Sequence, residues 1–214
     1  MKVAILGESS ADEAVVRIFV DAILGEPTDS VERYRLRSRG WPAVLNQLPA
    51  VLHALYYQSD ADALVVVVDS DSHPHDVAHD DPGPRDDSCH LCAVRSKIDA
   101  VRARLRPVQG RGSFRAAAGL AVPALEAWLW CGQDSLVTEQ NWINGLWAGE
   151  IPYTKLKLKQ WVYGTDRPDL VTETTRATER ARRLAENLAM LEERFPIGFG
   201  ALCREVRGWR GDLR

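Results

Sequence analysis

The run LVVVV at residues 64–68 constrains the fold of this chain more than any other stretch. A leucine and four valines follow one another with no alternation of polar and apolar positions. Such a run is typical of a strand that is buried on both faces, and strands of this kind occur in parallel sheets covered by helices on each side. We therefore expect an α/β domain built around a central strand at residues 63–68.

Segments on either side of this run alternate between strand-like and helix-like patterns. Short apolar runs and one period-two segment favour strands. Apolar residues spaced three or four apart favour helices, the first of them capped by Ser10. Alternation of this kind predicts a mostly parallel sheet flanked by helices. The expected strands span 2–7, 31–36, 63–68 and 114–122, and the expected helices span 11–24, 41–57 and 92–105.

The strand pattern stops at Pro123. Residues 133–170 follow no regular period but are rich in tryptophan and lysine, and residues 172–194 predict one long helix. We expect residues 1–130 to form a metal-binding α/β domain. Residues 131–214 are expected to form a basic, Trp-rich helical extension packed on that domain.

Charge is divided unequally along the chain. Residues 1–92 contain 16 Asp+Glu and 7 Lys+Arg, whereas residues 93–214 contain 14 and 20. This division is the pattern expected when one half holds cations and the other contacts a polyanion. Charge scattered over solvated helix faces explains the division equally well.

The cytoplasm is the expected compartment. Met1 leads directly into a strand-like segment, so no secretory leader is expected. No apolar run approaches the ~20 residues needed to cross a bilayer, so no membrane association is expected. Four cysteines among 214 residues do not indicate a disulfide framework.

Acidic residues follow three of the predicted strands. Glu8 follows the first, with Asp12 about one helical turn later; Asp69 and Asp71 follow the valine run; and Glu126 comes after the fourth strand. Ligands of open α/β sheets bind at the carboxyl ends of the strands, and carboxylate oxygens suit Mg²⁺. A turn after Asp69 would let both aspartates reach one ion. Taken singly, Glu8 can instead favour a helix N-terminus, Asp71 can cap a turn and Glu126 can be a surface residue.

Three stretches in order resemble a Toprim domain: GES-x-x-D at 7–12, VVVDSD at 66–71 and VPALEAWL at 122–129. The Toprim fold is the metal-binding fold of topoisomerases, primases and overcoming-lysogenization-defect (OLD) nucleases. Among Toprim proteins, the chain resembles the small, stand-alone Toprim-like proteins of bacteria. The resemblance covers roughly residues 1–130 and departs from the family at Ser9, where a glycine commonly stands.

The resemblance implies a role for each acidic residue. Glu8 would be a general acid/base or a metal ligand, Asp69 and Asp71 would hold Mg²⁺ or Mn²⁺, and Asp12 and Glu126 would complete an OLD-type, two-metal centre. The implied reaction is hydrolysis of phosphodiesters in DNA or RNA. The resemblance also implies an anti-phage effector with an ATPase partner. This sequence has no G-x-x-x-x-G-K-[ST] loop, so any ATP hydrolysis is expected to come from another chain. A homo-oligomer is a further expectation.

A nuclease also needs cations that contact the phosphate backbone of its substrate. The three lysines of the stretch YTKLKLKQW are flanked by a tyrosine and a tryptophan, whose rings can stack on unpaired bases. Alternatively, these lysines form the solvent-facing edge of a segment in which polar and apolar residues alternate. The candidates for nucleic-acid binding are Arg95 and Arg102 on the predicted helix 92–105, and Lys155, Lys157 and Lys159 in YTKLKLKQW.

Histidines and cysteines after the valine run form a candidate zinc site. Cys89-x-x-Cys92 is preceded by His75-x-x-x-His79, which has the ligand types and local spacing of structural zinc. Zinc would fasten a loop of about twenty residues, which is long for an α/β domain. The ligand order is reversed relative to the common zinc finger, and cysteines at a helix start are often simply packed.

Two other functions stay open. The stretch VVVVDSDS also resembles the D-x-D of haloacid-dehalogenase phosphatases, in which Asp69 would be a nucleophile. That family has its nucleophile near the N-terminus and a threonine after the second aspartate, where this chain has Ser72. The other alternative is a non-catalytic module that binds a partner through its tryptophans and its basic tail.

Overall fold

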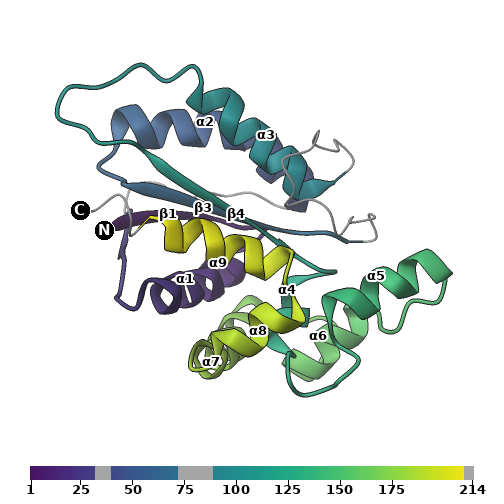
Figure 1. Ribbon diagram of the computed structural model, residues 1–214. Coiled ribbons are helices and arrows are strands. Elements are labelled where there is room, and N and C mark those ends of the chain that lie inside the picture. Colours follow the sequence, from purple (N-terminus) through teal and green to yellow (C-terminus); the bar gives the residue numbers. More distant parts are fainter. Residues whose placement is uncertain (32–39, 72–88, 210–214) are drawn as a thin grey trace.

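A four-stranded parallel sheet runs through the middle of the molecule, in the order β2-β1-β3-β4 (Figure 1). The computed structural model describes residues 1–31, 40–71 and 89–209. The predicted α/β fold with a mostly parallel sheet flanked by helices is therefore confirmed. The strands are β1 (Lys2–Leu6), β2 (Asp29–Ser30), β3 (Ala63–Asp69) and β4 (Arg115–Ala121).

The valine run forms β3, which lies between β1 and β4. Residues 64–68 are at most 3% exposed, as expected for a strand covered on both faces. Val3 pairs with Ala63 on one side, and Asp69 pairs with Ala121 on the other. This register places the carboxyl ends of the strands along one edge of the sheet.

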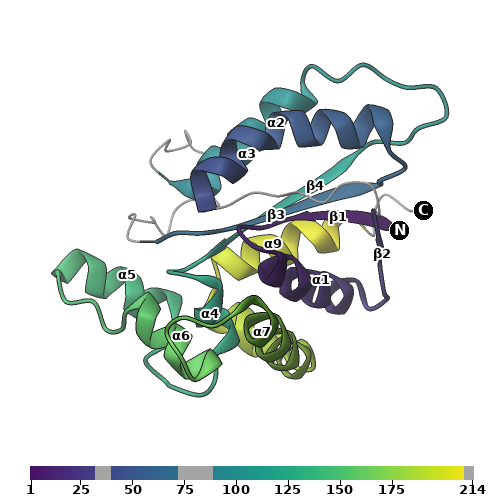
Figure 2. The ribbon, with the colours of Figure 1, turned by 180° about the vertical axis from the view of Figure 1, so that it is seen from behind.

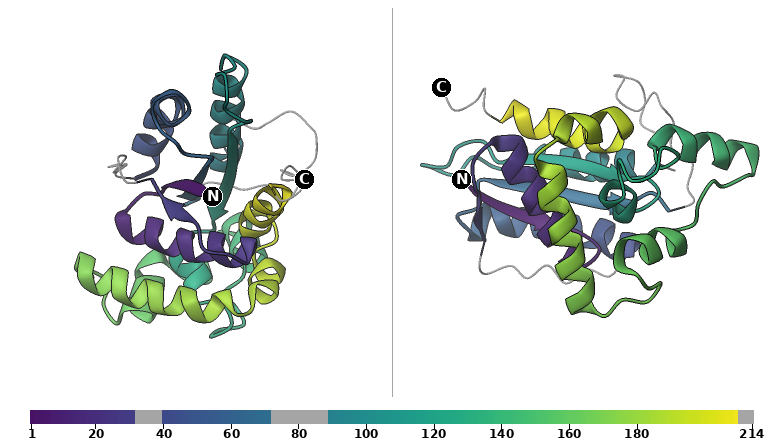
Figure 3. Two further views of the ribbon diagram at one scale, coloured as in Figure 1. Left: turned by 90° about the vertical axis from the view of Figure 1, so that its left-hand side faces the viewer. Right: turned by 90° about the horizontal axis from the view of Figure 1, so that it is seen from below.

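Helices cover both faces of the sheet (Figures 1 and 3). One face carries α1 (Ser10–Leu24) and α9 (Gly198–Gly208), and the other carries α2 (Gly40–Gln58) and α3 (His90–Arg102). The first turn of α1 is capped by Ser9, whose hydroxyl accepts a hydrogen bond from the amide of Asp12. The expected cap, Ser10, is instead the first residue of the helix.

The helix α9 lies unusually close to β4. A Cβ atom at Gly198 would be 1.9 Å from the carbonyl oxygen of Leu120, so only glycine fits there. The buried carboxylate of Glu139 accepts hydrogen bonds from the amides of Ile197 and Gly198, both at 2.8 Å. These contacts join the C-terminal helices to the edge of the sheet.

The remaining helices extend from the sheet beyond its carboxyl edge and under α1. In Figure 2, α5 reaches past the strand ends, α4 and α6 lie below them, and α7 lies against α1. None of the helices in the described part of the chain is long and apolar enough to span a membrane. The bounds are α4 (Leu125–Leu129), α5 (Glu139–Ala148), α6 (Lys155–Tyr163), α7 (Leu170–Ala185) and α8 (Leu188–Arg194).

Several predicted boundaries were wrong. The segment 133–170, expected to be irregular, contains α5 and α6, which begin after capping threonines and end at glycines in the left-handed region. The expected long helix 172–194 is two helices, because Asn187 interrupts it and caps α8. Of the expected strand 31–36, residues 32–36 lie outside the described residues, and β2 forms just before it.

Most of the tryptophans are packing residues. Trp128 is fully buried and meets Phe19 and Phe199 edge to face. Trp130 stacks on Trp161 with ring centroids 5.8 Å apart. Trp147 differs, because 70% of its surface is exposed.

Candidate functional site

The ends of β1 and β3 bring two of the predicted acidic residues together. The carboxylate of Glu8 accepts a hydrogen bond from the amide of Asp69 at 3.0 Å. The Oδ1 atom of Asp69 in turn accepts one from the amide of Leu125, the first residue of α4, also at 3.0 Å. Three segments that are far apart in the sequence therefore meet at this edge of the sheet.

A tight turn after β3 places Asp71 beside Asp69. The amides of Ser70 and Asp71 donate to the carbonyls of Ala121 and Pro123, at 2.9 and 3.0 Å. Asp71 has φ +52°, in the left-handed region, which aspartate tolerates better than most residues. The turn lets both carboxylates contact one cation, the ammonium group of Lys155, at 2.8 Å from Asp69 and 2.5 Å from Asp71.

Asp12 and Glu126 occupy the first turns of α1 and α4 and complete the acidic group. Glu126 is 5% exposed. Burial raises its pKa to about 7; the charge of Asp69 adds to this, and Lys159 opposes it. Burial, followed by the charges of Asp69 and Glu126, also raises the pKa of Asp12 well above its usual range.

The pKa values of Glu8 and Asp69 are both raised. Burial and then the charge of Asp69 raise the pKa of Glu8 to about 7, against the effect of the Asp69 amide and Lys155. Burial raises the pKa of Asp69, although Lys155 opposes the change. Carboxylates that are desolvated beside one another resist ionisation unless a cation compensates them.

The helix α6 supplies two cations to this carboxylate group. Lys155 and Lys159 lie one turn apart, which places both on the same face of the helix. Lys159 approaches the Oε1 atom of Glu126 at 3.8 Å. Lys157, between them, is exposed. The lysine run is helical, so the alternative of an alternating strand edge does not apply.

The structure does not bring the two predicted arginines to the site. Arg95 pairs with Glu205 of α9 at 2.6 Å, which joins α3 to α9. Arg102 donates to the carbonyl of Phe114, next to the start of β4, at the opposite end of the sheet from the carboxylates. The aromatic residues expected to stack on bases are also engaged, since Tyr153 is 2% exposed and Trp161 packs on Trp130.

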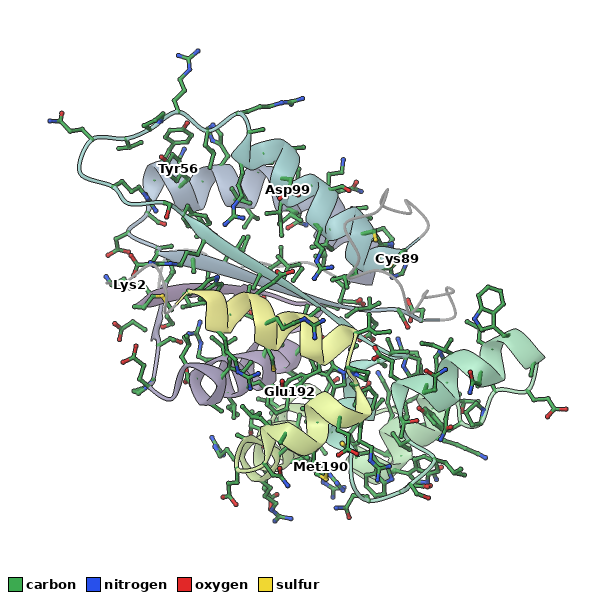
Figure 4. All side chains as sticks on the ribbon, in the orientation of Figure 1. Lys2, Tyr56, Cys89, Asp99, Met190 and Glu192 are labelled. Atoms are coloured by element: carbon green, nitrogen blue, oxygen red, sulfur yellow. The ribbon has the colours of Figure 1, made fainter. Side chains whose placement is uncertain are left out.

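Only half of the candidate zinc site can be described. Cys89 and Cys92 are buried, and Figure 4 shows Cys89 at the start of α3. Burial raises the pKa of the Cys89 thiol to about 12, which disfavours the thiolate that zinc requires. His75 and His79 lie outside the described residues, so zinc binding stays a prediction.

Two neighbours of the site were not singled out from the sequence. His90 is 4% exposed, and its Nδ1 atom lies 2.7 Å from the carbonyl oxygen of Asp69. Because a carbonyl only accepts, Nδ1 carries the proton. The ring of His90 stacks on Trp41 with centroids 3.8 Å apart. Trp41 begins the predicted helix 41–57 and His90 comes two residues before the predicted helix 92–105, and helices that follow parallel strands begin at this edge of a sheet.

The donor chemistry of the site fits a hard divalent cation. Five carboxyl groups lie near two lysines, so acidic groups outnumber the cations at this edge of the sheet. The hydroxyl of Ser70, between the two aspartates, is buried and has no hydrogen-bond partner within the described part of the chain. As the side chains stand, however, no three Asp, Glu, His or Cys residues in the described ranges are arranged to hold a metal ion.

Comparisons with known proteins give no relative: no protein-family model, no curated protein and no solved structure matches the chain.

Proposed function

We propose that the chain is a divalent-metal-dependent nuclease of the Toprim type that hydrolyses phosphodiesters in DNA or RNA. The observation that carries the proposal is the convergence of Glu8, Asp69 and Glu126, from three separate segments, at the carboxyl edge of a parallel sheet. This edge is where ligands of open α/β sheets bind. Carboxylates with raised pKa values in such a position are typical of functional sites.

The residues of the site would have different roles in hydrolysis. Asp69 and Asp71, with Glu8, Asp12 and Glu126 around them, would hold Mg²⁺ or Mn²⁺. One or two ions there would activate water and stabilise charge on the leaving oxygen. In the metal-free site the pKa of Glu8 is about 7, so Glu8 exchanges a proton near neutral pH, and a bound ion would lower this pKa and favour Glu8 as a ligand. Lys155, Lys157 and Lys159 would contact phosphate groups of the nucleic acid, which carboxylates alone would repel.

A cleavage assay tests the proposal. Supercoiled plasmid and total RNA are incubated with the protein in Mg²⁺, Mn²⁺ or EDTA. The proteins compared are the wild type, Asp69→Asn and, as a matched control, Asp166→Asn at an exposed aspartate outside the site. We expect metal-dependent cleavage by the wild type and the control, and loss of cleavage in Asp69→Asn. Cleavage that persists in Asp69→Asn would place the site elsewhere.

A phosphohydrolase with Asp69 as nucleophile is the second candidate. The contact between Lys155 and Asp69 favours it, because a lysine beside an aspartate can neutralise charge on a bound phosphate. Both oxygens of Asp69 already accept hydrogen bonds, from Leu125 and Lys155, which lowers their nucleophilicity. Trapping a phosphoryl group on Asp69 would establish this reading in place of the nuclease.

The partners stay predictions. Exposed Trp147, on α5, suits a contact with another protein, since tryptophan is enriched at interface hot spots. An ATPase partner or a second copy of the chain would be detected by co-purification and by the mass in solution. A chain that binds such a partner but cleaves nothing with any metal would instead be a binding module.

A further inference from the structure

The ammonium group of Lys155 lies where a cation bound by the two aspartates would lie. Its Nζ atom contacts Oδ2 of Asp69 and Oδ1 of Asp71 at once. The other oxygen of Asp69 is taken by the amide of Leu125. The site in this state therefore already holds one positive charge, supplied by the chain itself.

A divalent ion and this ammonium group would compete for the same oxygens. Two cations that share a carboxylate oxygen lie only a few ångströms apart, and their repulsion is strong in a partly buried site. The side chain of Lys155 is 34% exposed, so it has a route to solvent. Displacing it requires no movement of the sheet or of α4.

The helix that carries Lys155 is held more firmly at its far end than at its start. Leu158, Val162 and Tyr163 are buried, at most 2% exposed, whereas Thr154 and Leu156 at the first turn are exposed. The first turn depends on the cap at Thr154 and on the lysine contacts to the carboxylates. Loss of the Lys155 contacts would therefore loosen the first turn and leave the second in place.

We propose that Lys155 is an internal counterion that a divalent metal must displace, so that metal binding is coupled to release of the first turn of α6. The inference rests on the proposed metal site. It explains why the carboxylates gather without forming a metal-ready arrangement in the described residues. Released lysine is then available to contact the phosphates of a nucleic acid.

Calorimetric titration with Mn²⁺ tests the competition. The proteins compared are the wild type, Lys155→Met and Lys97→Met, the last removing an exposed lysine of α3 outside the carboxylate group. We expect Lys155→Met to bind Mn²⁺ at least ten-fold more tightly than the wild type, and Lys97→Met to match the wild type. Equal Mn²⁺ affinity in all three proteins would overturn the inference but would not contradict the proposed metal site.

Hydrogen exchange of the wild type provides a test that needs no variant. Mn²⁺ should speed exchange of the Lys157 and Leu158 amides, which donate to the hydroxyl and the carbonyl of Thr154, while amides of the second turn stay protected. Binding of Mn²⁺ with unchanged exchange at the first turn would overturn the coupling. Absence of Mn²⁺ binding in the wild type and in Lys155→Met would refute the proposed metal site, and this inference with it.

Discussion

Replacing Glu126 by glutamine should stabilise the metal-free protein at pH 8. The carboxylate is 5% exposed, and its pKa is raised from 4.5 to about 7, first by burial and then by Asp69. An ionised carboxylate with this displacement costs the folded state roughly 3 kcal/mol at pH 8. That cost already includes the attraction of Lys159, and glutamine avoids it, but the buried amide group of glutamine gives up hydrogen bonds with water worth about 1–2 kcal/mol. The net expected gain is about 1–2 kcal/mol.

The gain should depend on pH with a definite sign. Because the folded pKa lies above the unfolded one, the folded state binds more protons between pH 4.5 and about 7. Metal-free stability from this group is therefore lost as pH rises through that range. Glu126→Gln removes the contribution of Glu126 to the pH dependence of stability. The gain in stability over the wild type should therefore be large at pH 8 and small at pH 5.

Urea unfolding in EDTA, followed by circular dichroism at both pH values, measures the effect. Glu150→Gln is the matched control, because Glu150 is exposed and lies outside the carboxylate group. Saturating Mg²⁺ should stabilise the wild type more than Glu126→Gln. A variant that is less stable than the wild type at pH 8 in EDTA would refute the reasoning, as would an equal gain at both pH values.

Two further substitutions test the surroundings of the site. His90→Phe keeps an aromatic ring against Trp41 but removes the donor to the Asp69 carbonyl. We expect the rate of cleavage to fall at least ten-fold at unchanged folding. An unchanged rate would show that His90 does not position Asp69. Gly198→Ala forces a Cβ atom against the Leu120 carbonyl and should cost about 2–4 kcal/mol in thermal or urea unfolding. Gly208→Ala, which meets nothing within 4 Å, is its control, and equal stability of the two variants would contradict the close contact of α9 with β4.

The sheet and its acidic edge were predictable because their signals are local. An unbroken apolar run can only be a doubly covered strand or a buried helix, and the length of LVVVV with the aspartates after it favours the strand. Parallel topology then fixes which ends of the strands meet. The sequence alone therefore places Glu8 and Asp69 at one edge without any knowledge of their hydrogen bonds.

The helix α6 was missed because its pattern is ambiguous. Lysines at every second position of KLKLK suit the outer face of a strand, yet the same spacing puts Lys155 and Lys159 four residues apart on one helix face. Leu158 is buried and Leu156 is 60% exposed, so the alternating leucines do not share one environment. Only the packing of this segment in the folded protein decides between a strand and a helix.

The helix α9 was missed for a different reason. Its first turn contains Gly198 and Gly200, and glycine disfavours a helix by about 1 kcal/mol relative to alanine. Gly198 is required by the close contact with Leu120, which joins residues about eighty positions apart. A contact over such a separation leaves no local signal in the sequence.

The most direct test of the central claim is the position of a bound metal. A crystal of the protein soaked in Mn²⁺ should show an anomalous peak about 2.1 Å from carboxylate oxygens of Asp69 and Asp71. We expect that peak with Lys155 withdrawn from both aspartates. An aspartate pair that still holds Lys155 at saturating Mn²⁺, with no peak beside it, would contradict the account.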